Sequence, residues 1–382
     1  MKIAILGSSG EIGARLVQHF LSQGKDVVAF SRTKGSRLAR WGNLEFRSIN
    51  LFDIEESKKK LEDIDVVVNL IINKNLSDGI ENNIKYNIQL FENLMTVCNE
   101  LKIKRFVHYS SLVALPPRVT NNELDNPYLY SEEKDWYDVS KIETEKIAIK
   151  NRAKFPITII RPGIVYGPFM HWSTMLFNRM SRMNNMIPKE SEYLCYAIHV
   201  DDLVKLTEFL IDIDEKKLPQ LIYGVNPEKV SWNKYYSLHA KQIGFLKNLT
   251  LVDSKTIENH IYTVNNTDQT EEGIRKTSVK EFGIDVARKV FNKIPKPLIK
   301  SNIVQKPLTK FRAANFGLIN YGKEIGKIET PNLWPNNFEA ELFLTNGIIK
   351  DHHVGIDLGF KYQTNIIEGV KMAGDWWNYR VK

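Results

Sequence analysis

A tyrosine and a lysine four positions apart are the first residues whose types and spacing suggest catalysis. Tyr137 and Lys141 lie in the run Tyr-Asp-Val-Ser-Lys, and in a helix both side chains would project from one face. An ammonium group beside a phenol lowers the pKa of the phenol, so the tyrosine can exchange a proton with a hydroxyl or a carbonyl near neutral pH. Ser110 and Ser111 end the buried-looking run Phe106–Tyr109, and Ser111 precedes Tyr137 by 26 residues. Together these residues suggest proton transfer at an alcohol or a ketone.

A glycine-rich run near the N-terminus suggests a second function, the binding of a phosphate group. The run Gly-Ser-Ser-Gly-Glu-Ile-Gly follows the apolar segment Ile3–Leu6 and opens the amphipathic segment Ile12–Ser22. Glycines at a strand-to-helix turn let the backbone approach a pyrophosphate, and the helix N-terminus offers free N–H donors and a favourable dipole. This placement predicts a dinucleotide site. The residues expected to hold the cofactor here are Gly7, Ser9, Gly10, Glu11, Ile12 and Gly13.

The residues after the second apolar run indicate which dinucleotide binds. A carboxylate at this point would accept hydrogen bonds from the ribose 2′-hydroxyl of NAD and would repel a 2′-phosphate. This chain has Ser31 and Arg32 there, with Arg15 and Lys34 as further cations within reach. A guanidinium can bind a phosphate through two hydrogen bonds. The sequence therefore favours NADP, held by Ser31 and Arg32, with NAD as the alternative.

Short apolar runs alternate with helix-period segments through the first 165 residues. The expected strands are Ile3–Leu6, Val27–Phe30, Leu44–Ile49, Val66–Ile72, Phe106–Tyr109 and Ile157–Ile160. The expected helices are Ile12–Ser22, Ile54–Leu61, Ile80–Leu101 and Val139–Asn151. This alternation predicts βαβ units and a parallel sheet that is buried on both faces.

The pattern changes after Pro168, where a stretch rich in methionine and aromatic residues begins. The elements expected beyond it are a helix at Asp201–Ile213, a strand at Leu221–Val225 and helices at Trp232–Gly244 and Glu271–Ile294. We predict an α/β fold, with a doubly wound parallel Rossmann sheet and a smaller C-terminal α/β substrate lobe. The dinucleotide-binding domain is assigned to residues 1–168, with residues 199–226 returning to it, and the substrate lobe to residues 169–382.

The net charge of +8 comes from one segment. Between Val286 and Lys323 there are nine basic residues and no acidic one, so the rest of the chain, with 44 basic and 45 acidic residues, is nearly neutral. Apolar residues alternate with the cations of this basic segment. Three interpretations are open: a helical flank of the substrate lobe, contact with an anionic membrane surface, and binding of a substrate diphosphate. Nucleic acid is not an expected partner, because no known reader motif accompanies the charge.

Composition limits the class of protein further. Hydrophobic residues make up 43% and charged residues 26% of the chain, as in ordinary globular proteins. Cys98 and Cys195 both lie in apolar surroundings and are expected to be buried and reduced. No apolar run approaches the 18 residues of a membrane-spanning helix, and the N-terminus does not resemble a signal peptide. We expect a cytoplasmic protein that acts on a small molecule, with peripheral membrane contact and a homodimer left open.

Further motifs follow the glycine run and the Tyr/Lys pair in order. Arg161–Pro168 resembles an R-P-x-x-V-Y-G-P segment, His199–Asp202 an H-V-D-D element, and Asp357–Phe360 with Glu368 and Trp376 an L-G-[YF]…E-G…W ending. With these motifs the chain resembles the extended short-chain dehydrogenases/reductases, the NAD-dependent epimerase/dehydratase-like family. Its members include nucleotide-sugar epimerases, dehydratases and reductases, and 3β-hydroxysteroid dehydrogenase-like enzymes. The resemblance covers residues 1–230 firmly and residues 345–380 weakly.

The resemblance implies roles for individual residues. Tyr137 would be the catalytic acid/base, Lys141 would bind the nicotinamide ribose and lower the pKa of Tyr137, and Ser111 would hydrogen-bond the reacting oxygen. Pro162, Ile164 and Val165 would pass the nicotinamide, and Asn87 matches the asparagine of the helix before the serine-bearing strand. No metal is expected, because His199 before two aspartates is typical of a buried residue that caps a helix.

Departures from the family pattern bear on the substrate. Leu112 and Val113 follow Ser111, where nucleotide-sugar 4,6-dehydratases carry an Asp-Glu pair, so dehydration would lack its carboxylates. The segment from Val113 to Pro117 is an apolar turn in place of the family's V-Y-G. The leading expectation is hydride transfer at a secondary alcohol or ketone of a nucleotide-activated sugar. The alternatives are a reductase of an apolar ketone and a non-catalytic NADP-sensing protein.

Overall fold

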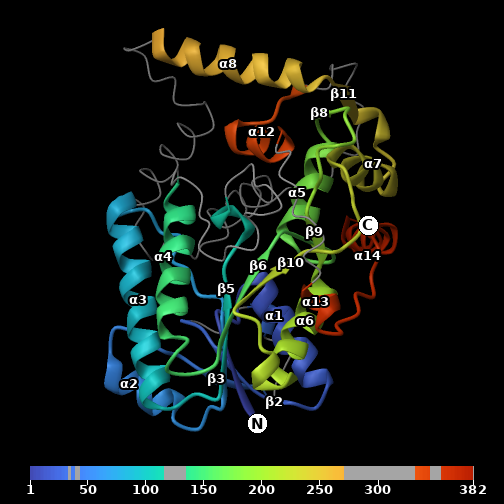
Figure 1. Ribbon diagram of the computed structural model, residues 1–382. Coiled ribbons are helices and arrows are strands. Elements are labelled where there is room, and N and C mark those ends of the chain that lie inside the picture. The colour runs from blue at the N-terminus through green and yellow to red at the C-terminus, as the bar shows by residue number, and fades with distance from the viewer. Residues whose placement is uncertain (33–35, 39–43, 116–134, 271–331, 345–353, 382) are drawn as a thin grey trace, which may run out of the picture.

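The computed structural model describes residues 1–32, 36–38, 44–115, 135–270, 332–344 and 354–381 (Figure 1). The predicted helix at Glu271–Ile294, the basic segment and Lys34 lie outside these residues.

A parallel sheet of seven strands forms the centre of the described chain. Its strands are β1 (Lys2–Leu6), β2 (Asp26–Phe30), β3 (Glu45–Arg47), β4 (Val66–Asn69), β5 (Arg105–Tyr109), β6 (Ile157–Pro162) and β10 (Leu221–Gly224). They lie in the order β10-β6-β5-β4-β1-β2-β3, and every neighbouring pair is parallel. The chain winds outward in both directions from the β1–β4 pair, and ligands of such sheets bind at the carboxyl ends of the strands beside this switch point. The predicted doubly wound α/β fold is confirmed.

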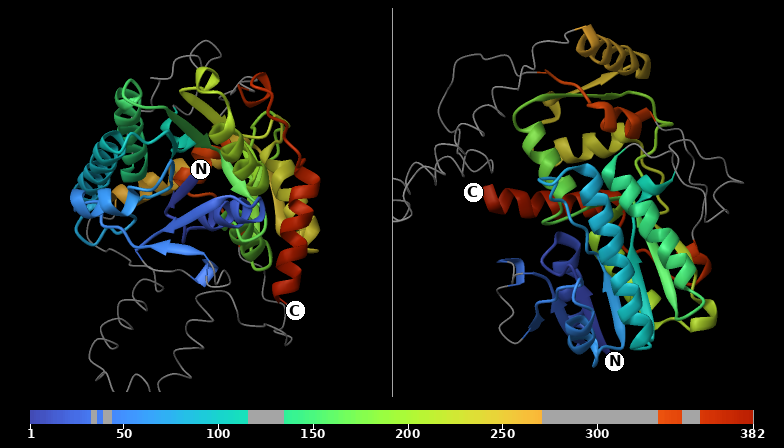
Figure 2. Two further views of the ribbon diagram at one scale, coloured as in Figure 1. Left: turned by 90° about the horizontal axis from the view of Figure 1, so that it is seen from below. Right: turned by 90° about the vertical axis from the view of Figure 1, so that its left-hand side faces the viewer.

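Helices cover both faces of the sheet (Figure 2). α1 (Glu11–Ser22) and α6 (Val200–Asp212) pack against one another and share one apolar core with the strands. α2 (Ile54–Leu61), α3 (Ile80–Glu100) and α4 (Trp136–Asn151) contribute to a second core on the opposite face. The strands are apolar in succession because both of their faces are buried.

The fourth strand is shorter than its apolar run predicts. The run continues to Ile72, but β4 ends at Asn69. Beyond it, Asn73 donates its N–H to the Asn87 side chain at 2.7 Å, and the Asn83 side chain donates to the Asn73 carbonyl at 3.0 Å. These side-chain hydrogen bonds from α3 satisfy the backbone in place of a sheet partner, so the segment after Asn69 is held outside the ladder.

The second part of the molecule contains two small parallel sheets. β7 (Ile164–Tyr166) pairs with β9 (Ala197–His199), and β8 (Asn184–Pro188) lies between β11 (Leu249–Val252) and β12 (Asn332–Leu333). The helices here are α5 (His171–Met180), α7 (Trp232–Gln242), α8 (Ser254–Thr270), α12 (Asn337–Leu344), α13 (Val354–Asp357) and α14 (Ile366–Val381). Short 3-10 turns occur at η1 (Ser36–Leu38), η2 (Leu112–Ala114), η3 (Glu215–Lys217) and η4 (Leu246–Asn248).

The core of this second part is aromatic. Tyr166, Trp232, Tyr235, Tyr236 and Phe343 are almost fully buried in one cluster that also takes in apolar residues of α14. α14 lies beside α7, at the right of Figure 1. Among the described helices, none combines the length and the apolar character that crossing a membrane requires.

Candidate active site

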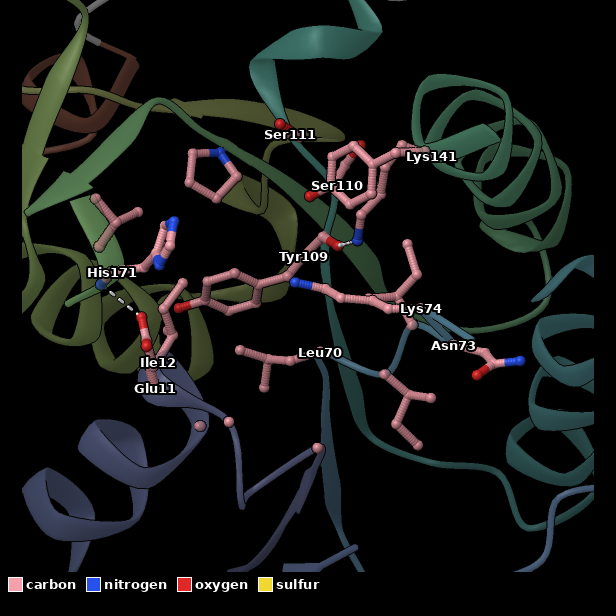
Figure 3. Close-up of a pocket in the computed structure, with 18 of the residues that line it drawn as sticks. Glu11, Ile12, Leu70, Asn73, Lys74, Tyr109, Ser110, Ser111, Lys141 and His171 are labelled. Carbon is pink, nitrogen blue, oxygen red and sulfur yellow. Dashed lines mark hydrogen bonds between the residues drawn. The ribbon is translucent and has the colours of Figure 1, made fainter. Parts of the chain in front are cut away.

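A cavity of about 1170 Å³ opens at the carboxyl ends of the strands, beside the β1–β4 switch point. Both parts of the molecule line it, and Figure 3 shows side chains from each pointing into it. The residues to which the sequence analysis assigned catalysis or direct cofactor contact lie on its wall. These are Gly7, Ser9, Gly10, Glu11, Ile12, Gly13, Ser31, Arg32, Ser111, Tyr137, Lys141, Pro162, Ile164 and Val165.

The glycine run forms a tight turn at one end of the cavity. Gly7 has a φ of +87°, and its N–H donates to the Phe30 carbonyl at 2.9 Å. A Cβ on Gly13 would lie 2.4 Å from the Gly7 carbonyl oxygen, so only glycine allows α1 to start this close to β1. No side chain caps the first turn of α1, which begins after Gly10. This bare turn and helix N-terminus fit the pyrophosphate of a dinucleotide.

Cations lie beyond the glycine run, in the direction of the second strand. Arg32 is exposed on the cavity wall, and Arg37 lines the same end. Arg37 donates to the Ser9 carbonyl at 3.3 Å. The sequence analysis named Arg15 as a further cation for the 2′-phosphate. In the structure Arg15 pairs with Asp201 at 2.6 Å and is not among the residues that line the cavity. Sequence reasoning missed Arg37, and its only signal was the continuation of basic residues beyond Arg32.

The serine, tyrosine and lysine meet near the middle of the cavity. The Lys141 Nζ donates to the Tyr109 carbonyl at 2.7 Å and lies 5.7 Å from the centre of the Tyr137 ring. Burial lowers the pKa of Lys141 to about 8, although Glu145 acts in the opposite direction. The predicted lowering of the Tyr137 pKa is not found: burial raises this pKa, and a hydrogen bond with the Ser111 side chain only partly offsets the rise.

A buried ion pair supports the helix that carries Tyr137 and Lys141. The Arg161 guanidinium donates to both carboxylate oxygens of Glu145, at 2.9 and 2.6 Å, and both side chains are fully buried. Glu145 lies one helical turn beyond Lys141 on α4, and Arg161 lies on β6. The pair therefore fixes α4 to the sheet beneath the reacting groups.

The loop after β4 forms another side of the cavity. Asn87 on α3 holds both the N–H and the carbonyl of Asn73, at 2.7 and 3.1 Å. Lys74 follows and, as Figure 3 shows, extends into the cavity toward Tyr109. Its charge also lowers the pKa of Lys141. No local pattern indicates a role for Lys74, because its position depends on where β4 ends.

Hydrophobic residues contribute to the cavity lining from two further regions of the chain. We define the substrate-side wall as a set of hydrophobic lining residues. Some of them belong to η2 or directly follow it, and the others belong to the second part of the chain. They are Leu112, Val113, Leu115, Met170, Trp172, Leu194, Tyr196, Trp232 and Leu342. The Trp232 indole N–H is already used, since it donates to the Leu342 carbonyl at 2.9 Å.

Comparison with known families establishes the kinship of the chain. The model described as the NAD dependent epimerase/dehydratase family matches residues 3–224. The chain belongs to this family. The match spans the glycine run, Ser111, Tyr137, Lys141 and the last strand of the central sheet, so the predicted resemblance is confirmed.

Curated relatives match only part of the chain. The sterol-4-alpha-carboxylate 3-dehydrogenase (decarboxylating) of Dictyostelium discoideum is 23% identical over 176 residues, which are 43% of this chain and 53% of that enzyme. Protein CapI of Staphylococcus aureus is 27% identical over 237 residues, 55% of this chain and 69% of its own. The alignment thus spans about half the length of the Dictyostelium enzyme.

Solved structures share the fold of this family member. UDP-glucose 4-epimerase of Thermotoga maritima, solved with UDP-glucose, has a TM-score of 0.65 at 14% identity, with 100% of both chains covered. UDP-glucuronic acid 4-epimerase of Bacillus cereus, solved with UDP-glucuronic acid and NAD, has a TM-score of 0.55 at 20% identity. That comparison covers 66% of this chain and 86% of the Bacillus chain.

His199 and the two cysteines, for which the sequence analysis predicted no catalytic role, are all buried. His199 is fully buried, and its Nδ1 accepts the N–H of Asp201 at 3.3 Å, so it caps α6 as expected. Cys98 and Cys195 are free and buried, and burial raises the pKa of both thiols. These three residues contribute to packing and capping away from the cavity wall.

Proposed function

We propose that this chain is an NAD(P)-dependent oxidoreductase or epimerase of the short-chain dehydrogenase/reductase type, which acts at a secondary alcohol or a ketone. The convergence of Ser111, Tyr137 and Lys141 on a cavity whose other end is the glycine run supports this reaction most directly. When bound, the nicotinamide cofactor accepts or supplies the hydride. Ser111 holds the reacting oxygen by a hydrogen bond, and Tyr137 takes the hydroxyl proton during oxidation or returns it during reduction. The Lys141 ammonium binds the cofactor ribose.

In this proposal the cofactor and the substrate occupy different parts of the chain. Residues 1–168 with 199–226 bind the cofactor, and the remainder of residues 169–382 binds the substrate. Removal of the tyrosine hydroxyl tests the catalytic assignment. Tyr137→Phe should reduce turnover at least about 100-fold because it removes the proton donor, while NADPH binding stays within about threefold of the wild type. Tyr262→Phe, on the exposed face of α8, is the matched control, and unchanged turnover in Tyr137→Phe would overturn the assignment.

The cofactor we propose is NADP. Two observations support a 2′-phosphate: Arg32 and Arg37 line the cavity, and the residues directly after β2 are Ser31 and Arg32 instead of a carboxylate. NAD is the dinucleotide named in the Bacillus cereus structure, so the two forms must be compared directly. Separate fluorescence titrations with NADPH and NADH should give tighter binding of NADPH, and tighter binding of NADH would refute the preference.

Two substrate classes have distinct support. The likeness of the fold to UDP-sugar epimerases supports a nucleotide-activated sugar. The substrate-side wall supports an apolar ketone or alcohol as a second class, because its hydrophobic side chains can bury the apolar surface of such a substrate. The Dictyostelium relative, by its name a sterol dehydrogenase, agrees with the second class.

A substrate panel distinguishes the two classes. The full chain with NADP⁺ or NAD⁺ is assayed against UDP-glucose, UDP-glucuronic acid and a 3β-hydroxysteroid, with absorbance at 340 nm as the readout for oxidation and product chromatography for epimerisation. Turnover of the steroid alone would establish the apolar class. Turnover of a UDP-sugar alone would establish the nucleotide-sugar class.

A further inference from the structure

One carboxylate connects the glycine run to the second part of the molecule. Glu11 is the first residue of α1, inside the glycine run, and its Oε2 accepts the backbone N–H of His171 at 2.7 Å (Figure 3). The two residues are 160 positions apart in the sequence. His171 is the first residue of α5, so the bond connects the proposed cofactor end directly to an element of the second part of the molecule.

The contact is favourable for α5. The first N–H groups of a helix have no partner within the helix, and the helix N-terminus carries a partial positive charge. Met170, in the capping position of α5, makes no side-chain hydrogen bond to the helix. Glu11 therefore supplies from outside both the acceptor and the negative charge that this helix end lacks.

α5 in turn positions one side of the cavity. Met170, His171 and Trp172, at its start, all line the cavity. Met170 and Trp172 belong to the substrate-side wall. The position of this part of the wall thus depends on a bond made by the glycine run.

The second oxygen of the carboxylate faces a cation that a phosphate would also attract. Glu11 Oε1 lies 3.4 Å from Arg37 Nη2, while Arg37 Nη1 contacts the Ser9 carbonyl at 3.3 Å. A carboxylate within the glycine run repels a pyrophosphate, and Arg37 reduces this repulsion. A bound dinucleotide would attract Arg37 toward its phosphates. The Glu11 carboxylate would then lose its contact with Arg37 and interact mainly with the N-terminus of α5.

We propose that Glu11 is a positioning residue that holds α5 against the glycine run and so couples dinucleotide binding to the order of the substrate-side wall. The coupling to the cofactor rests on the proposed dinucleotide site, whereas the positioning of α5 by Glu11 is independent of that proposal. Cofactor binding strengthens the contact between Glu11 and His171 and thereby reduces the motion of Trp172, which follows His171 on α5.

Hydrogen exchange of the α5 backbone tests the proposal without a known substrate. The full chain is measured by mass spectrometry with and without saturating NADP⁺, as wild type, Glu11→Ala, Glu11→Gln and Glu55→Ala. Glu11→Gln keeps an acceptor oxygen but removes the charge. Glu55 lies on α2 with its side chain 83% exposed, so Glu55→Ala is a matched control for the loss of a surface carboxylate.

Two quantities are compared among the variants: the rate of hydrogen exchange in α5 and the affinity for NADP⁺. In Glu11→Ala the first turn of α5 should exchange about tenfold faster than in the wild type, because a bond to a charged acceptor is lost, and Glu11→Gln should restore most of the protection. NADP⁺ affinity in both Glu11 variants should stay within about threefold of the wild type, because the loss of a repelling charge and the loss of the coupling act in opposite directions. NADP⁺ should slow α5 exchange in the wild type and in Glu55→Ala but not in Glu11→Ala.

The positioning role, the coupling and the proposed cofactor can each be refuted by a different result. Equal α5 exchange in Glu11→Ala and the wild type without NADP⁺ would refute the positioning role, whatever the cofactor does. NADP⁺ that binds without slowing α5 exchange in the wild type would refute the coupling while the proposed function stands. Failure of the wild type to bind NADP⁺ would refute the proposed cofactor and the coupling together, and the comparison without NADP⁺ would still decide the positioning role.

Discussion

Removal of the Glu145 carboxylate should destabilise the protein far more than removal of an exposed carboxylate. Glu145 and Arg161 are both 0% exposed and are joined by two hydrogen bonds of 2.9 and 2.6 Å. Glu145→Ala would leave the Arg161 charge in the interior with its main partner gone. Loss of one member of a buried pair costs about 3–5 kcal/mol, whereas Glu55→Ala should cost less than about 0.5 kcal/mol.

Urea unfolding followed by circular dichroism at pH 7.5 measures these differences. The double substitution Glu145→Met/Arg161→Met should be less destabilising than Glu145→Ala alone, because it removes both charges and refills the space. Glu145 also raises the pKa of Lys141, so Glu145→Gln should shift the lysine titration below pH 8. Activity that needs the Lys141 ammonium should then decline at a lower pH than in the wild type. The reasoning is refuted if Glu145→Ala costs no more than Glu55→Ala.

Three further substitutions test the cofactor end and the buried lysine. Arg32→Asp should reverse the cofactor preference by at least about tenfold in favour of NADH, as measured by paired titrations, and an unchanged preference would exclude Arg32 from cofactor choice. Gly13→Ala would place a Cβ 2.4 Å from the Gly7 carbonyl oxygen, so NADPH binding should be lost and thermal stability reduced; a wild-type affinity would contradict the tight turn. Burial lowers the Lys141 pKa to about 8, below its unfolded value of about 10.4, so the unfolded state binds more protons between these values and stability should rise as pH increases from about 8 to 10. Lys141→Met should remove that rise, and urea midpoints at pH 7.5 and 9.5 that change equally in both proteins would refute it.

Local sequence patterns predicted the cofactor half of the molecule well. The sequence analysis predicted that the glycine run joins a strand to a helix, and in the structure it joins β1 to α1. All of its proposed contact residues line the cavity. The Tyr137/Lys141 spacing likewise requires only one helical turn, and α4 provides it. Such features depend on neighbours in the sequence, so periodicity and turn residues are sufficient to place them.

Features set by distant contacts could not be predicted in the same way. The apolar run that contains β4 leaves the sheet early because Asn87, on the following helix, binds the backbone of Asn73. This contact also places Lys74, which the sequence analysis did not single out. α8 was missed because its residues, rich in asparagine and threonine, have low helix propensity. The rise in the Tyr137 pKa reflects burial by the whole fold, which the Tyr/Lys spacing does not reveal.

The close contact made by Gly369 has a consequence for the synthesis of the protein. A Cβ at Gly369 would lie 2.6 Å from the Tyr166 hydroxyl oxygen and 2.9 Å from His199 Cδ2, so α14 closes directly over the aromatic core. α14 begins 124 positions after α7 ends. At ordinary ribosomal rates this interval lasts on the order of ten seconds. Throughout it the aromatic face of the growing polypeptide has no cover from α14, and this period is when the nascent chain is most exposed to aggregation and to capture by chaperones.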